Sequence, residues 1–146
     1  MQVKKIFEQN GISIIDDKQF EKVIELVKDR CTLLTDFVQQ ASFFFKAPEQ
    51  IDITAIKPKW DEKKNQFFVE LILAYDLSTL WQHDDLEKAF KEMAAARQIK
   101  PGEVLSAFRI MLVGGKFGPG VFDIAAIIGK RETIDRIKHT LQMLAL

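Results

Sequence analysis

The sequence of 146 residues is 47% hydrophobic and carries 21 basic and 21 acidic side chains. This composition supplies enough apolar surface for a folded core and excludes an intrinsically disordered chain. The single cysteine, Cys31, excludes an internal disulfide. The sequence contains neither a long apolar run nor a secretory leader pattern, so we expect a reduced, cytoplasmic setting and no membrane insertion.

The charge is distributed unevenly along the chain. Residues 1–96 contain 13 Lys/Arg and 17 Asp/Glu, whereas residues 97–146 contain 8 and 4. A polyanion would therefore prefer the second part, although an excess of this size also occurs on faces that bind nothing. Charge alone indicates only where a nucleic-acid site should be sought.

Apolar residues at helical spacing predict two helices in the first third of the chain, near 17–29 and 31–46. Asp16 or Asp17 can cap the first, because its carboxylate can accept hydrogen bonds from unpaired N–H groups of the first turn. The following segment, 47–58, contains two prolines and alternating isoleucines, which predicts an extended connection. We place the boundary between two subdomains, 1–57 and 58–146, at its end.

The rest of the chain is also helical in pattern. Five further helices are predicted, at 59–75, 84–97, 101–113, 119–128 and 131–144. Pro101 and Pro119 suit first helical positions, and Asp84 and Asp85 suit the positive end of a helix dipole. The expected fold class is all-α, a bundle or cage of about six to seven helices in two small subdomains.

The sequence offers little for catalysis or metal binding. His83 and His139 are far apart, and neither belongs to a HExxH or CxxC pattern, so no metal site is expected. His83 beside Asp84 and Asp85 suits a solvated helix N-terminus better than acid–base chemistry, because no nucleophile lies near it in sequence. Cys31 suits a buried structural thiol better than an activated nucleophile.

A glycine-rich segment, 113–120, joins two of the late helices. It lacks the GxxxxGK[ST] order and follows a helix rather than a strand, so a nucleotide-phosphate loop is not expected. It can be a plain connection, or a turn whose backbone approaches a ligand closely. Arg109 on the preceding helix can lie beside it, either contacting a base through its planar guanidinium or forming a surface salt bridge.

Three stretches around this turn carry a resemblance: FRIMLVG at 108–114, GPGVFD at 118–123 and IGKR at 128–131. In order and spacing they resemble the C-terminal signature of bacterial-type glutamyl-tRNA synthetases, a class I aminoacyl-tRNA synthetase family, which reads approximately PLRxALTG, xxPxLFE and LGKE. Weaker similarity reaches back to 27–33, so nearly the whole chain resembles that family's anticodon-binding region.

The resemblance implies roles for individual residues. Arg109 matches an arginine that contacts an anticodon base, and Gly118, Pro119 and Val121 fall on positions that line a base pocket. Arg30 matches a second arginine that reads the last anticodon base. The sequence departs from the family where Gly118 removes a hydroxyl often found before the proline, so only backbone contacts can survive at that position.

The resemblance also implies a part of a larger enzyme. The HIGH and KMSKS-type signatures are absent, as is the strand–helix alternation of a nucleotide-binding catalytic domain. We therefore expect a non-catalytic part without a cofactor, whose parent ligates glutamate to tRNA-Glu using ATP and Mg in its catalytic domain. The expected partners of this monomer are tRNA-Glu and that upstream domain, and the alternative is a helical protein–protein interaction module without RNA binding.

Overall fold

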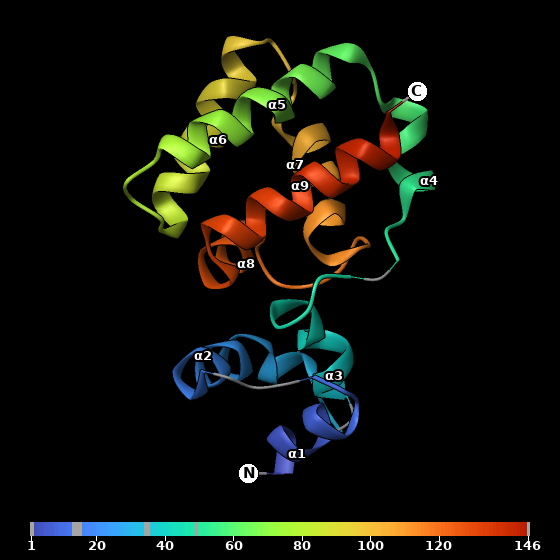
Figure 1. Ribbon diagram of the computed structural model, residues 1–146, viewed down its shortest axis with the longest axis vertical. Helices are drawn as coiled ribbons and strands as arrows, with labels where there is room; N and C mark the ends of the chain where they lie inside the picture. The colour runs from blue at the N-terminus through green and yellow to red at the C-terminus, as the bar shows by residue number, and fades with distance from the viewer. Residues whose placement is uncertain (1, 13–15, 34–35, 49, 146) are drawn as a thin grey trace. The chain divides into compact units, whose positions relative to one another are not determined.

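The computed structural model describes residues 2–12, 16–33, 36–48 and 50–145 (Figure 1). These residues form helices and connections without a strand, which confirms the all-α prediction. Contacts divide the chain into two compact units, Met1–Ala47 and Pro48–Leu146. None of the helices in the described ranges is both long and apolar enough to cross a membrane.

The first unit is built around phenylalanine rings. Its elements are α1 (Gln2–Gln9), α2 (Asp17–Val27), η1 (Lys28–Arg30), α3 (Asp36–Ala41) and η2 (Ser42–Phe44). Phe7 packs edge-to-face against Phe20 and Phe45, with ring centroids 5.6 and 5.5 Å apart. Asp16 caps α2 as predicted, because its Oδ1 accepts from the amides of Lys18 and Gln19 at 3.0 and 3.2 Å.

The helix predicted at 31–46 is shorter than its apolar pattern suggested. In the described part of that segment, α3 begins at Asp36 and gives way to the 3-10 helix η2, while residues 34 and 35 lie outside the described residues. Before α3, the Asp36 carboxylate accepts from the amides of Thr32 and Leu33, both at 2.9 Å. These hydrogen bonds hold a turn where a helix was expected, and they lower the pKa of Asp36.

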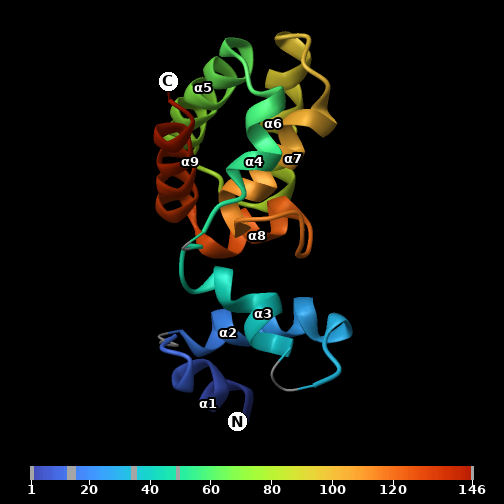
Figure 2. The same cartoon turned by 90° about the vertical axis from the view of Figure 1, so that its right-hand side faces the viewer.

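The second unit contains the remaining helices, seen from two sides in Figures 1 and 2. They are α4 (Ile53–Ile56), η3 (Lys57–Lys59), α5 (Glu62–Leu77), α6 (His83–Ala96), α7 (Pro101–Val113), α8 (Val121–Ile128) and α9 (Lys130–Leu144). Helix α9 packs against α5, α7 and α8, and α8 also packs against α6. The core between them holds five phenylalanines that are at most 4% exposed: Phe67, Phe68, Phe90, Phe108 and Phe122.

In segment 47–58, residues 47, 48 and 50–52 lie in no helix, as its prolines suggested, but its second part is helical. It forms α4 and then η3, in which Pro58 occupies a first-turn position where its missing N–H breaks no hydrogen bond. The segment also belongs to the second unit, because Ile56 is buried there and the Asp52 amide donates to the Gly114 carbonyl at 2.9 Å. Contacts thus divide the chain after Ala47, whereas the sequence pattern placed the boundary after residue 57.

Helix α7 ends at Gly114 because only glycine fits the backbone there. Gly114 has φ +92°, and a Cβ on it would lie 2.5 Å from the Gln50 carbonyl oxygen. We expect Gly114→Ala to lower the free energy of unfolding by about 1–3 kcal/mol, measured by urea denaturation followed by circular dichroism.

The same substitution at the other end of α7 is the control. Gly102 lies within the helix, and a Cβ added there would meet no heavy atom of the described residues within 4 Å. Gly102→Ala should therefore raise stability by up to about 1 kcal/mol. Equal losses at both positions would contradict the close approach of the Gln50 backbone.

Candidate nucleic-acid interface

Arg109 is anchored to the loop that joins α7 and α8. Its Nη1 donates to the carbonyl oxygens of Phe117 and Gly118, both at 3.1 Å, and to that of Pro119 at 2.6 Å. The predicted juxtaposition of this arginine and the glycine-rich turn is therefore observed. Carbonyl groups of the loop fix where the guanidinium lies, which lowers the entropy that Arg109 loses on contacting a ligand.

Arg109 also lines an open hollow of about 400 Å³, here called the base hollow. Its apolar wall comes from Leu105 on α7 and from Val121 and Phe122 at the start of α8. Its polar lining includes Ser106, Arg109, Lys116, His83 and Glu87. A volume of this size suits a small planar ligand, and an apolar wall beside a guanidinium suits a nucleic-acid base.

The structure brings some of the predicted site residues together and separates others. Arg109 and Val121 both line the base hollow. The described residues that line the base hollow do not include Gly118 and Pro119; their carbonyl oxygens accept hydrogen bonds from Arg109 instead. Gly118 has φ +100°, and Pro119 is buried. Arg30 ends η1 in the first unit, and its side chain lies outside the described part of the structure.

Pro119 also differs from its predicted role at a helix start. Helix α8 begins at Val121, with Gly120 as its N-cap residue. The Pro119 carbonyl accepts from Arg109 at 2.6 Å and so belongs to the loop that holds the guanidinium. A contact with a side chain ten positions earlier, rather than the local preference of proline, defines this turn.

Sequence reasoning missed several lining residues. Leu105 and Ser106 precede Arg109 by four and three positions on α7, so helical spacing alone could have placed them on the same face. His83 and Glu87 come from α6, and no local signal connects that helix to the turn after α7. Only packing in three dimensions brings them to the base hollow.

Side chains of both charges line the base hollow. His83 Nδ1 lies 2.6 Å from Asp123 Oδ1, and His83 Nε2 lies 3.9 Å from a Glu87 oxygen, so two carboxylates flank the ring. Arg109 and Lys116 carry positive charge elsewhere on the lining. An anion in the hollow is therefore attracted toward Arg109 and Lys116.

A buried arginine holds the end of α7 from which the loop departs. Arg136 is 4% exposed, and its Nη1 donates to the Leu112 carbonyl at 2.7 Å while its Nε donates to Glu132 at 2.9 Å. Burial lowers the pKa of Arg136, and the nearby Glu132 carboxylate opposes that shift. Arg136 thus satisfies a carbonyl of the last α7 turn, which would otherwise lack an intrahelical partner.

The remaining candidates for chemistry offer no reactive constellation within the described residues. Cys31 is half-buried, and its Sγ donates to the Val27 carbonyl at 3.4 Å. Burial raises the pKa of the Cys31 thiol, which disfavours the nucleophilic thiolate. In the part of the chain that the structure describes, no group of three or more His, Cys, Asp or Glu side chains is placed to hold a metal ion.

The chain is similar to known proteins over nearly its whole length. Residues 2–141 match a family model described as an anticodon binding domain. The glutamate–tRNA ligase of Porphyromonas gingivalis is 31% identical over 141 residues, which cover 97% of this chain and 28% of the relative. The glutamate–tRNA ligase of Flavobacterium johnsoniae is 32% identical over 139 residues, which cover 90% of this chain and 28% of the relative.

Solved structures give the same result. The crystal structure of a glutamate tRNA ligase from Elizabethkingia meningosepticum, in complex with its amino acid, matches with a TM-score of 0.88 at 31% identity over 99% of this chain and 28% of that one. The crystal structure of a glutamate-tRNA synthetase from Elizabethkingia anophelis matches with a TM-score of 0.75 at 30% identity. The match covers 97% of this chain and 27% of that protein's chain. The chain thus spans little more than a quarter of these relatives, and it belongs to the anticodon binding domain family, which confirms the resemblance drawn from the signature around Arg109.

Proposed function

We propose that this chain recognises the anticodon loop of tRNA-Glu as the C-terminal, anticodon-binding part of a glutamate–tRNA ligase. The family and the names of the relatives support this role. In the proposed parent, an upstream catalytic domain of the same chain joins glutamate to tRNA-Glu using ATP and Mg, in the cytoplasm. The present chain contributes binding and no chemical step.

The observation that carries the proposal is that Arg109, whose guanidinium is held by three loop carbonyls, lines the base hollow. Proteins read single-stranded RNA by splaying bases out of the loop, stacking their faces and contacting their edges. Leu105, Val121 and Phe122 supply a wall for the face of one such base. Arg109 supplies the cationic, planar contact, and Arg30 is a second candidate reader in the first unit.

The proposed roles of Gly118 and Pro119 follow from where their carbonyls lie. Both act through backbone oxygens that orient Arg109. A side chain at Gly118 is not needed for such a contact, so a glycine at this position is compatible with base recognition. The identity of the preferred base would then depend mainly on Arg109 and on the shape of the base hollow.

The test is a titration of two labelled RNA stem–loops, one with the tRNA-Glu anticodon loop and one with the same stem and a scrambled loop. We expect tighter binding of the cognate loop in fluorescence anisotropy, at both low and moderate salt. Affinity for both RNAs should fall with salt, with a log–log slope of about −0.7 for each single-stranded phosphate contacted. Equal affinity for the two loops at both salt concentrations would rule out base reading.

A protein-docking module is the second candidate, and one surface favours it. Helix α5 exposes Val69, Leu73 and Leu77, one turn apart, with 38%, 60% and 80% of each residue accessible. An apolar stripe of this kind suits a partner protein. The same titration separates the two functions, because an apolar docking surface gives no preference between RNA loops of equal charge.

A further inference from the structure

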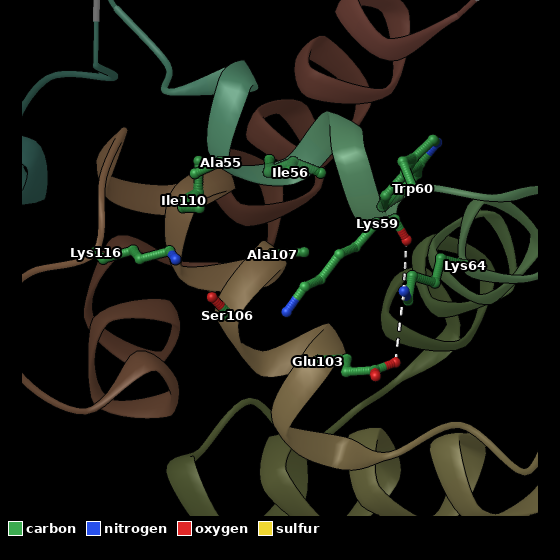
Figure 3. A pocket seen from close by; sticks show the side chains of 10 residues that line it. All are labelled: Ala55, Ile56, Lys59, Trp60, Lys64, Glu103, Ser106, Ala107, Ile110 and Lys116. Carbon is green, nitrogen blue, oxygen red and sulfur yellow. Dashed lines mark hydrogen bonds and ion pairs between the residues drawn. The ribbon is translucent and has the colours of Figure 1, made fainter.

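A second, smaller hollow of about 100 Å³ lies beside the base hollow (Figure 3). Its polar lining comes from η3, α5, α7 and the following loop and consists of Lys59, Lys64, Glu103, Ser106 and Lys116. In Figure 3 the side chains of Lys59 and Lys116 extend into the hollow from opposite sides, and the Ser106 hydroxyl lies between them. Its volume equals about three times the share of one water in the liquid, which is enough for an oxyanion.

The charges around this hollow do not cancel. The buried Lys64 ammonium donates to the Lys59 carbonyl at 2.5 Å and lies 3.4 Å from Glu103, so the only carboxylate among the described lining residues already has a cationic partner. Lys59 and Lys116 are exposed, and within the described residues neither forms an ion pair. Two positive charges and one hydroxyl therefore face the same small space.

The two hollows share part of their lining. Ser106 and Lys116 belong to both, so a group bound in one directly adjoins a group bound in the other. The base hollow is also lined by Glu87, which lies 3.5 Å from Lys91 and 3.9 Å from His83, and the His83 ring lies 2.6 Å from Asp123. A nucleotide whose base lies against Arg109 can therefore place a phosphate favourably beside Lys59 and Lys116, which form no ion pair within the described residues.

We propose that the hollow between Lys59, Ser106 and Lys116 binds one backbone phosphate of the RNA strand whose base occupies the base hollow. This assignment rests on the proposed function for the identity of its ligand. A phosphodiester presents two non-bridging oxygens that only accept hydrogen bonds, which matches two ammonium groups and a hydroxyl. Such a contact fixes the register of the strand and carries no sequence information.

The decisive variant is the double substitution Lys59→Gln, Lys116→Gln. It should weaken binding of the cognate and scrambled stem–loops by the same factor, roughly threefold to tenfold, and reduce the salt slope by about 0.7. Lys57→Gln is the matched control, because it removes the same charge from the same 3-10 helix at an exposed position that lines neither hollow. An equal loss per charge in the control would overturn the site and leave loop recognition intact.

A second probe locates the phosphate. In a series of stem–loops, each RNA carries a neutral methylphosphonate in place of one phosphate of the loop. We expect the replacement at one position to weaken binding to the unmodified protein. At that position the double variant should lose nothing further, whereas additive losses would overturn the proposal.

A titration with inorganic phosphate tests the anion site independently of the proposed recognition of the anticodon loop. If neither loop is preferred, the proposed function fails, and phosphate titrated into the ¹⁵N-labelled chain then tests the anion site alone. A shift of the Ser106 amide in the unmodified chain that is absent in the double variant supports the site. No shift, or a larger shift with a glutamate-rich peptide than with phosphate, overturns it.

Discussion

Replacing Phe108 with alanine is expected to lower the free energy of unfolding by about 3–5 kcal/mol, which is the range for removing a fully buried phenylalanine ring. Phe108 is 0% exposed in the middle of the second unit. Its ring centroid lies 5.2 Å from that of Phe90 and 6.1 Å from that of Phe122. The substitution therefore removes contacts that join α7 to both α6 and α8, and urea denaturation followed by circular dichroism should show a lower midpoint.

Phe117→Ala is the matched control, because it makes the same chemical change at a ring that is 46% exposed. A half-exposed position should lose about 1 kcal/mol or less. If the two variants lost equal stability, the core would not lie between α6, α7 and α8. Phe108→Leu, which keeps much of the apolar volume, should fall between them.

Replacing Arg109 with alanine is expected to remove about 1–3 kcal/mol of the preference for the cognate anticodon loop, a typical value for one good base contact. Arg109 lines the base hollow, and its guanidinium is held by the carbonyls of Phe117, Gly118 and Pro119. The measurement is the affinity ratio of the cognate and scrambled stem–loops for each variant. A similar loss on both RNAs would mean that Arg109 acts through charge alone and reads no base.

Two further variants separate charge, geometry and loop order. Arg109→Lys keeps the charge but lacks the planar fork, so it should lose the preference while keeping most of the salt slope. Arg131→Ala removes a charge from an exposed position on α9 that lines neither hollow and should leave the preference unchanged. Because Arg109 also anchors the loop, the amide signals of Gly118 and Gly120 show whether the loop keeps its conformation in each variant.

Much of the fold was predictable from local patterns. The apolar spacing of α5, α6, α7 and α9 indicated long helices, and the structure has them close to the expected bounds. The cap at Asp16 and the end of α7 at Gly114 followed from carboxylate hydrogen bonding and from the backbone freedom of glycine. Arg109 was expected on the helix before the turn, where its side chain could lie beside it, and its hydrogen bonds to the loop carbonyls place it there.

Segments whose conformation depends on distant contacts were predicted less well. The prolines of 47–58 favoured an extended chain, yet burial of Ile56 and the hydrogen bond from Asp52 to Gly114 accompany a short helix there. Pro119 favoured a helix start, yet its carbonyl accepts from Arg109 two residues before α8 begins. In both segments local preference is worth little free energy, so a few tertiary contacts decide the outcome.

The sequence by itself determined the helical class and the main helices, because these depend on neighbours within one or two turns. It also carried the signature whose resemblance to a known family indicates anticodon binding. Only the tertiary structure brought Lys59 and Lys116 to Ser106, and His83 to Asp123. These residues come from elements that are far apart along the chain. Which side chains share one hollow is a property of helix packing, and no spacing within a single helix encodes it.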